Sequence, residues 1–218
     1  MKPTTVTRHI RQLVLAVSLI GLGSVSAAVP EAQFQSAFQQ FVQATSGDAG
    51  AIERATEAFS ALLKTEPSNP VLLAYAGAAT AMKATTTWLP WKKMAYAEDG
   101  LAQLDKALAL LSPAHNANVQ NGTPGVLEAK FVAANTFLAV PGFMNRGERG
   151  ARLLGDVVSS PLLANAPLGF KGSVWLKAAT QASNAKNTVE AKRYLELIVH
   201  NQAPQTAQAQ TLLKGLTS

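Results

Sequence analysis

Apolar side chains recur every three or four positions along most of the sequence after residue 30, and no stretch alternates strictly between apolar and polar residues. The first pattern is typical of helices that bury one face, whereas strict alternation is typical of half-buried strands. The sequence therefore predicts an all-α protein. The expected helices span about residues 31–45, 49–65, 70–82, 90–111, 124–138, 146–158, 168–184, 188–200 and 204–216.

Three of these helices carry a start signal in the sequence. Asn69 precedes Pro70 and Thr123 precedes Pro124, and a capping residue followed by proline is a common first turn. Asn187, with a glutamate three residues later, resembles a capping box. We expect each of these polar side chains to cap the helix that follows it.

Helix-breaking prolines recur at intervals of forty-odd residues. They are Pro67, Pro113, Pro161 and Pro204. Two predicted helices lie between successive breaks, which is the pattern of a helical-repeat protein. The sequence predicts an α-solenoid of antiparallel helical hairpins, with about four pairs and a terminal helix.

One window fits a known repeat in a single register. If a repeat begins at Gly172, bulky and small residues fall at the fourth, seventh, eighth, twentieth, twenty-fourth and twenty-seventh positions: Trp175, Ala178, Ala179, Ala191, Leu195 and Ile198. The second half of the pattern recurs at Ala55, Phe59 and Leu62, and more loosely at Gly100, Leu104 and Ala107. Small residues allow two helices to approach closely, and bulky residues fill the space between hairpins.

On these residues the sequence resembles the tetratricopeptide-repeat superfamily, closely over 172–204 and in outline elsewhere. The proline spacing exceeds the usual repeat of roughly 34 residues. It implies enlarged loops and leaves HEAT-like packing as an alternative. Segments 87–94, 128–131 and 138–143 are similar to a group of exported bacterial tetratricopeptide-like proteins of unassigned function. That resemblance implies a fold and a location but no catalytic residue.

The first 27 residues have the three parts of a secretory signal. Lys2, Arg8 and Arg11 precede an apolar run at 13–23, and small residues then offer a cleavage site after Ala27. The run is too short for a membrane span, which needs about 20 residues, so an uncleaved anchor is the weaker alternative. We expect a periplasmic or secreted product without stable membrane insertion, in which residues 28–218 form a single helical-repeat domain.

Charge and composition exclude several functions. Three of the 19 basic residues and none of the 13 acidic ones lie in the first 27 positions, so the remainder carries only +3 and is not expected to bind nucleic acid. The chain has no cysteine, and His115 and His200 lie far apart. It has no HExxH, phosphate-loop or G-x-S-x-G motif. We expect no metal site, no cofactor and no enzymatic activity.

An aromatic and basic cluster at the start of one predicted helix is the first candidate binding site. It comprises Trp88, Trp91, Lys92, Lys93 and Tyr96. Tryptophan and tyrosine are enriched at the energetic centres of protein interfaces, which predicts an anchor for a partner. The alternative is that both tryptophans fill space between hairpins.

The second candidate lies near the next hairpin junction. It comprises Phe143, Asn145, Arg146 and Arg149, with Arg152 one turn further on. Arginines at such spacing can recognise a carboxylate or phosphate. The alternative is a solvated helix face on which Glu148 and Asp156 pair with the arginines. We expect stacking of the hairpins to bring both candidates into one concave patch.

The sequence thus predicts a periplasmic scaffold or adaptor that binds a protein or peptide of the cell envelope on a helical-repeat surface. Affinity would come from a few aromatic and arginine anchors on a pre-formed surface. The alternative is a small-ligand or lipid carrier that serves an envelope transporter, which a long apolar pocket between helices would favour.

Overall fold

The computed structural model describes residues 29–216, and these fold into nine α-helices with no strand. The proposed signal at 1–27 lies outside the described residues. The helices are α1 (Glu31–Ala44), α2 (Ala49–Thr65), α3 (Pro70–Met82), α4 (Pro90–Ala109), α5 (Gly125–Phe137), α6 (Gly147–Val158), α7 (Leu168–Asn184), α8 (Thr188–His200) and α9 (Thr206–Leu216). Each predicted helix is present with its ends within about two residues, so the all-α prediction is confirmed.

Two of the three expected helix caps are present. The Asn69 side chain accepts hydrogen bonds from the first backbone N–H groups of α3, and Asn187 accepts one from Glu190 N at 3.1 Å. The Glu190 carboxylate instead accepts from Arg193, so the capping box is only half formed. The prediction for Thr123 was wrong: this residue is buried, and α5 begins after Pro124 without a side-chain cap.

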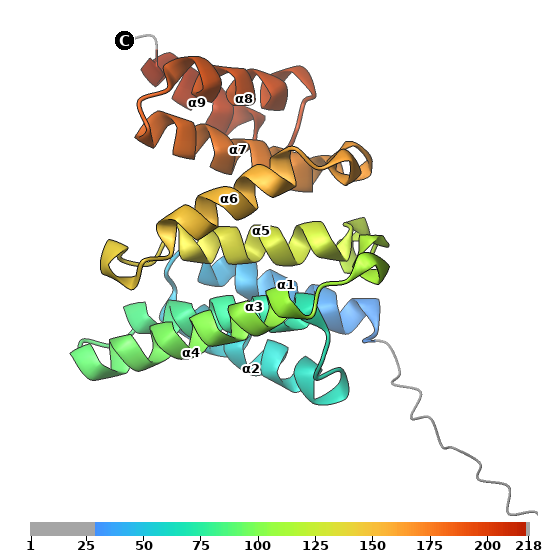
Figure 1. The fold of residues 1–218 in the computed structure, drawn as a ribbon, viewed down its shortest axis with the longest axis vertical. Helices are drawn as coiled ribbons and strands as arrows, with labels where there is room; N and C mark the ends of the chain where they lie inside the picture. Colours follow the sequence, from blue (N-terminus) through green and yellow to red (C-terminus); the bar gives the residue numbers. More distant parts are fainter. Residues whose placement is uncertain (1–28, 217–218) are drawn as a thin grey trace, which may run out of the picture.

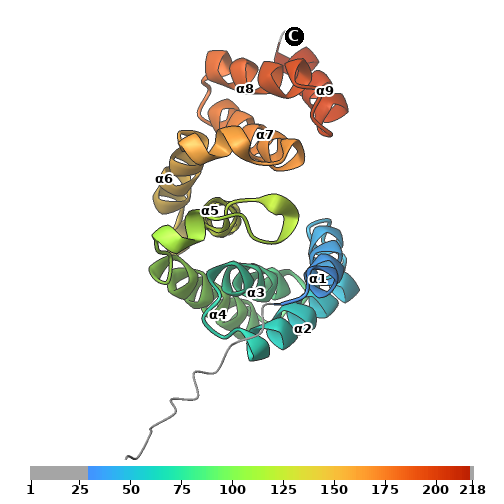
Figure 2. The same cartoon turned by 90° about the vertical axis from the view of Figure 1, so that its right-hand side faces the viewer.

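The helices follow one another along the long axis of the molecule, from α2 and α4 at one end to α8 and α9 at the other (Figure 1). Successive helices pack against each other, with the closest packing between α3 and α4, α7 and α8, α1 and α2, and α5 and α6. Turned by 90°, the molecule has α4 and α6 on one side and α1 on the other, with α5 between them (Figure 2).

Helix α3 is the centre of the larger core. Nearly all of its residues are buried, and it contacts α1, α2, α4 and α5. A helix that is apolar all round must be enclosed by others, and the sequence from Pro70 to Met82 has no charged residue. Five rings join α1, α2 and α3 in edge-to-face and stacked contacts: Phe34, Phe38, Phe41, Phe59 and Tyr75. These rings fix α1 against α3.

No helix within residues 29–216 is both long and apolar enough to cross a membrane.

The long connection from α4 to α5 forms two short 3-10 turns, Pro113–Asn116 and Gln120–Gly122. The second turn lies against α1. It therefore places Asn121 next to α1 and to the start of α5.

Candidate functional site

A groove of about 910 Å³ is bordered by α1, α3, α5 and the start of α7. In Figure 2, α1 and α7 lie on opposite sides of α5. Large apolar side chains from all four helices line the groove: Phe38, Phe41, Val42, Tyr75, Met82, Phe131, Val132 and Phe170. Polar side chains lie between them, but most of the exposed lining is apolar, and the groove is partly open to solvent.

Glu128, in the first turn of α5, is the most buried charged residue on the groove wall. Only 2% of it is exposed. Its Oε1 accepts a hydrogen bond from the Tyr75 hydroxyl at 2.7 Å and a longer one from Asn121 Nδ2 at 3.4 Å. Its Oε2 is buried and has no hydrogen-bond partner. An unpaired buried carboxylate oxygen is costly, and Oε2 is such an acceptor, without a donor in the described part of the chain.

Burial raises the pKa of Glu128 to about 7, although the hydrogen bonds from Tyr75 and Asn121 lower it, and the nearby charge of Glu31 raises it further. Burial, with the adjoining carboxyl, also raises the pKa of Tyr75 well above its ordinary value. Tyr75 therefore stays a donor, and Glu128 changes charge close to neutral pH.

The backbone of Asn121 has a left-handed conformation, with φ of 66°. Asparagine tolerates this conformation better than most residues. Its side-chain oxygen accepts a hydrogen bond from Gln35 of α1, while its amide nitrogen faces Glu128. Asn121 thus connects α1 to Glu128 in the groove wall.

Lys177 of α7 lines the same groove. Burial lowers its pKa, and none of the ion pairs among residues 29–216 involves it. The groove therefore combines an apolar surface with one acidic and one basic side chain. None of the nine residues predicted as binding residues lies among its lining.

The first predicted cluster lies on the surface, at the start of α4. Trp88 and Trp91 are 83% and 67% exposed, and Lys92 and Lys93 are exposed beside them. The alternative that these tryptophans fill space between hairpins is wrong. Tyr96 is half-buried, and the ammonium group of Lys83 lies 5.2 Å from its ring centroid.

The arginines of the second cluster already have an intramolecular partner. Arg146 Nη2 lies 3.0 Å from Asp105 Oδ2 of α4, and Arg149 pairs with the same carboxylate. Both guanidinium groups also lie over the Phe137 ring. The alternative was wrong about the partners: Asp156 pairs with Lys130 and not with an arginine. Asn145 and Phe143 are exposed on the 3-10 turn before α6.

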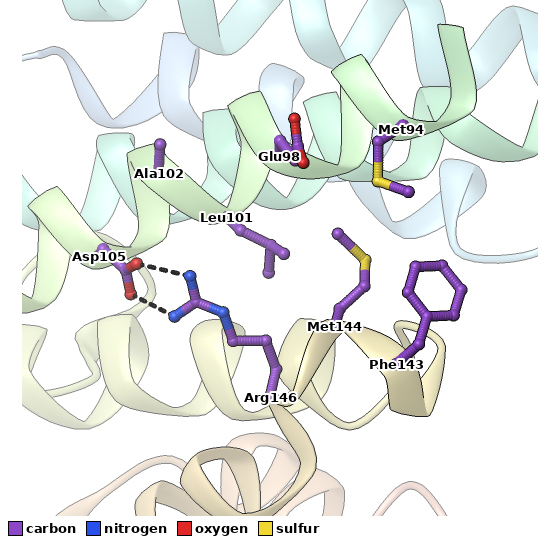
Figure 3. Close-up of a pocket in the computed structure, with 8 residues that line it drawn as sticks. All are labelled: Met94, Glu98, Leu101, Ala102, Asp105, Phe143, Met144 and Arg146. Carbon is purple, nitrogen blue, oxygen red and sulfur yellow. Dashed lines mark hydrogen bonds and ion pairs between the residues drawn. The ribbon is translucent and has the colours of Figure 1, made fainter. Parts of the chain in front are cut away.

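A small pocket of about 360 Å³ lies between α4 and that turn (Figure 3), and of the nine predicted residues only Phe143 and Arg146 line it. Met94 of α4 lies near Phe143 and Met144, while Arg146 reaches Asp105 at the other end. No residue of the first cluster is among the lining of this pocket, so the expectation of one concave patch stays a prediction. The pocket belongs to α4 and the α5–α6 connection, and the large groove is lined mainly by α1, α3, α5 and α7.

No protein-family model, curated protein or solved structure matches the chain. Among the described residues, no three His, Cys, Asp or Glu side chains come together as metal ligands. The site can bind through its apolar walls, the Glu128 carboxyl and the Lys177 ammonium group. Sequence reasoning missed it, although Glu128 shares a helical stripe with Phe131, Val132 and Asn135, which all line the groove.

Proposed function

We propose that this protein is a non-catalytic binding protein, an α-solenoid of antiparallel hairpins of the tetratricopeptide-like kind, which holds an apolar segment of a partner protein. The hairpins would be α1–α2, α3–α4, α5–α6 and α7–α8, with α9 at the end. The first helix of every hairpin contributes to the groove. In a solenoid, such helices form an extended concave binding surface.

The buried positions support this repeat assignment. The residues that match the repeat pattern in the last hairpin are buried, except Trp175, which is half-buried: Ala178, Ala179, Ala191, Leu195 and Ile198. The matching positions of α2 and α4 are buried as well: Ala55, Phe59, Leu62, Gly100, Leu104 and Ala107. Both small and bulky side chains occupy these buried positions, which supports the proposed repeat.

The observation that carries the proposal is the apolar lining of the groove across four helices. Apolar grooves of this kind bind segments of other proteins through regularly spaced side-chain anchors. The groove is partly open to solvent, which gives a bound segment access to it. We place this activity in the periplasm or outside the cell, on the strength of the secretory pattern at 1–27.

The second candidate function is a carrier for a small apolar molecule or lipid. It is favoured by the groove volume of about 910 Å³, which lies within the usual range for small-molecule sites, roughly 300–1,000 Å³. A carrier would hold its ligand without a protein partner in the groove. The two candidates therefore differ in what co-purifies with the protein.

Photo-crosslinking at matched valines tests the proposal. Val42 is 50% exposed and lines the groove, whereas Val189, at the start of α8, is 82% exposed and is not among the lining residues. A photoreactive residue is placed at each position, and the products from the exported fraction are identified by mass spectrometry. We expect a defined segment of one partner from position 42 only, and the synthetic segment should bind the purified chain.

Three outcomes oppose that expectation. Equal crosslinking from both positions would indicate non-specific contact and would contradict the groove as the binding site. A small apolar molecule in native mass spectra, without a protein crosslink, would favour the carrier. Neither a crosslink nor a bound molecule, from folded and exported protein, would overturn both functions.

A further inference from the structure

We propose that Glu128 is the anchor for one positively charged side chain of the segment in the groove, so that the partner is an apolar sequence carrying a lysine or arginine. This inference rests on the proposed function. It follows from two independent observations, the apolar groove and the unpaired carboxylate oxygen within its wall.

The hydrogen bonding of Glu128 is asymmetric. Oε1 has both internal donors, the Tyr75 hydroxyl and the Asn121 amide, and Oε2 has none. A carboxylate has two acceptor oxygens, and a buried charge is stable only when it is paired. An ammonium or guanidinium group at Oε2 would supply the missing donor and the compensating positive charge. A neutral or anionic ligand could not offer the same charge compensation.

The surroundings also suit a cation. The rings of Phe38, Phe41, Tyr75 and Phe131 line the groove, and aromatic faces attract cations. One other charged group bears on Glu128: Glu31 of α1, whose charge raises its pKa. Lys177 of α7 also lines the groove. The positive charge of Lys177 disfavours a second cation beside it. The groove is therefore selective for a single positive charge near α5.

A purely structural role for Glu128 predicts a different behaviour. If its function were only to connect α3 to α5, Oε1 would suffice, because the bond from Tyr75 needs one acceptor. A glutamine keeps that acceptor and the side-chain length. Glu128→Gln therefore separates the two roles: it preserves the internal bond and removes the negative charge.

The test uses decylammonium, which joins an apolar chain to a lysine-like head, and decanol, which has the same chain and no charge. Both are titrated into the full mature chain by calorimetry, and NMR contacts to Val132 and Val140 locate the bound chain. We expect decylammonium to bind about tenfold or more tightly than decanol, as for a hydrogen bond to a charged group. In Glu128→Gln the two probes should bind equally.

A measurement on the wild-type chain alone provides a second test. The free Glu128 carboxyl has a pKa of about 7, and a bound cation favours its ionised form. Decylammonium binding at pH 7 should therefore release about half a proton, measured in buffers of different ionisation enthalpy. Its affinity should rise about tenfold from pH 6 to pH 8. The decanol affinity should not rise.

The outcomes separate this inference from the proposed function. Equal binding of both probes to the wild-type chain, without proton release, would overturn the role of Glu128 and leave the apolar groove intact. A preference for decylammonium that persists in Glu128→Gln would also overturn it. If neither probe bound in the groove, both the inference and the proposed function would fail.

Discussion

Gly77 of α3 and Gly100 of α4 lie so close that neither position has room for a side chain. A Cβ at Gly100 would lie 2.5 Å from the carbonyl oxygen of Gly77 and 2.6 Å from the backbone nitrogen of Ala81. A Cβ at Gly77 would lie 2.8 Å from the carbonyl oxygen of Gly100. All three obstacles are backbone atoms, which cannot turn aside as a flexible side chain would. This contact sets the distance between the two helices.

Gly100→Ala should therefore destabilise the protein, although alanine is the better helix former. Forcing a methyl group into a packed core typically costs about 1–3 kcal/mol, and we expect a loss of that size in urea unfolding followed by circular dichroism. Gly155→Ala in α6 is the matched control, because a Cβ there meets nothing within 4 Å. It should be neutral or stabilising, by up to about 1 kcal/mol. Equal effects at both positions would contradict the close contact.

The helices were largely predictable from the sequence, because each one carries its own local signal. Apolar spacing marked all nine helices, and Asn69 and Asn187 marked two starts through their caps. The prediction for Thr123 failed because threonine is a common capping residue, whereas this threonine is buried beside the start of α5. Whether a polar residue caps or packs depends on tertiary contacts, which local patterns do not contain.

The site was less predictable, because it depends on contacts between distant segments. Asp105 lies 41 residues before Arg146. The sequence therefore pointed only to acidic residues closer to the arginines as their partners. The same holds for Tyr75 and Glu128, which are 53 residues apart. An exposed tryptophan and a buried one also look alike in a sequence. Only the single acidic residue in α5, set among apolar positions, hinted at the groove.

Asp105→Ala tests the ion pairs that join α4 to α6. The charged side chains of Asp105, Arg146 and Arg149 are each about one-third exposed, so solvent weakens their attraction. We expect a loss of about 1 kcal/mol in the free energy of unfolding, smaller at high salt. A double-mutant cycle with Arg146→Ala should give a coupling of about 0.5–1 kcal/mol.

Glu148→Ala is the control for that cycle, since Glu148 was the nearer candidate partner and has no ion pair with either arginine. It should change the unfolding free energy by less than about 0.5 kcal/mol. A coupling between Arg146 and Glu148 larger than that between Arg146 and Asp105 would contradict the observed pairing.

Trp91→Ala should leave the stability almost unchanged. The ring is two-thirds exposed, and surface substitutions usually alter the unfolding free energy by no more than about 0.5 kcal/mol. Phe59→Ala removes a fully buried ring of the α1–α2–α3 core, and it should cost about 3–5 kcal/mol. Urea unfolding of the two variants measures the contrast. A loss above about 2 kcal/mol for Trp91→Ala would mean that its ring packs against the fold.

The pH dependence of stability follows from the buried carboxyl of Glu128. Its pKa is about 7 in the folded chain, against an ordinary value of 4.5. Between these values the folded state holds the proton more tightly than the unfolded state, so the free energy of unfolding falls as the pH rises. The contribution is fully present below about pH 4.5 and is lost above about pH 7. The shift corresponds to about 3 kcal/mol over that range.

Glu128→Gln should remove this dependence, because the amide stays neutral and still accepts the hydrogen bond from Tyr75. Urea unfolding at pH 5 and pH 8 should show the variant close to the wild type at pH 5 and more stable at pH 8. The same substitution at exposed Glu148 is the control, and it should keep the wild-type difference between the two pH values. If the wild type were as stable at pH 8 as at pH 5, or if the glutamine variant lost stability on the same rise, the carboxyl would not be buried as the structure places it.

A cation bound at Oε2 would reverse this pH trend, because it stabilises the ionised form of Glu128. With saturating decylammonium the wild type should therefore regain stability at pH 8, and Glu128→Gln should gain far less.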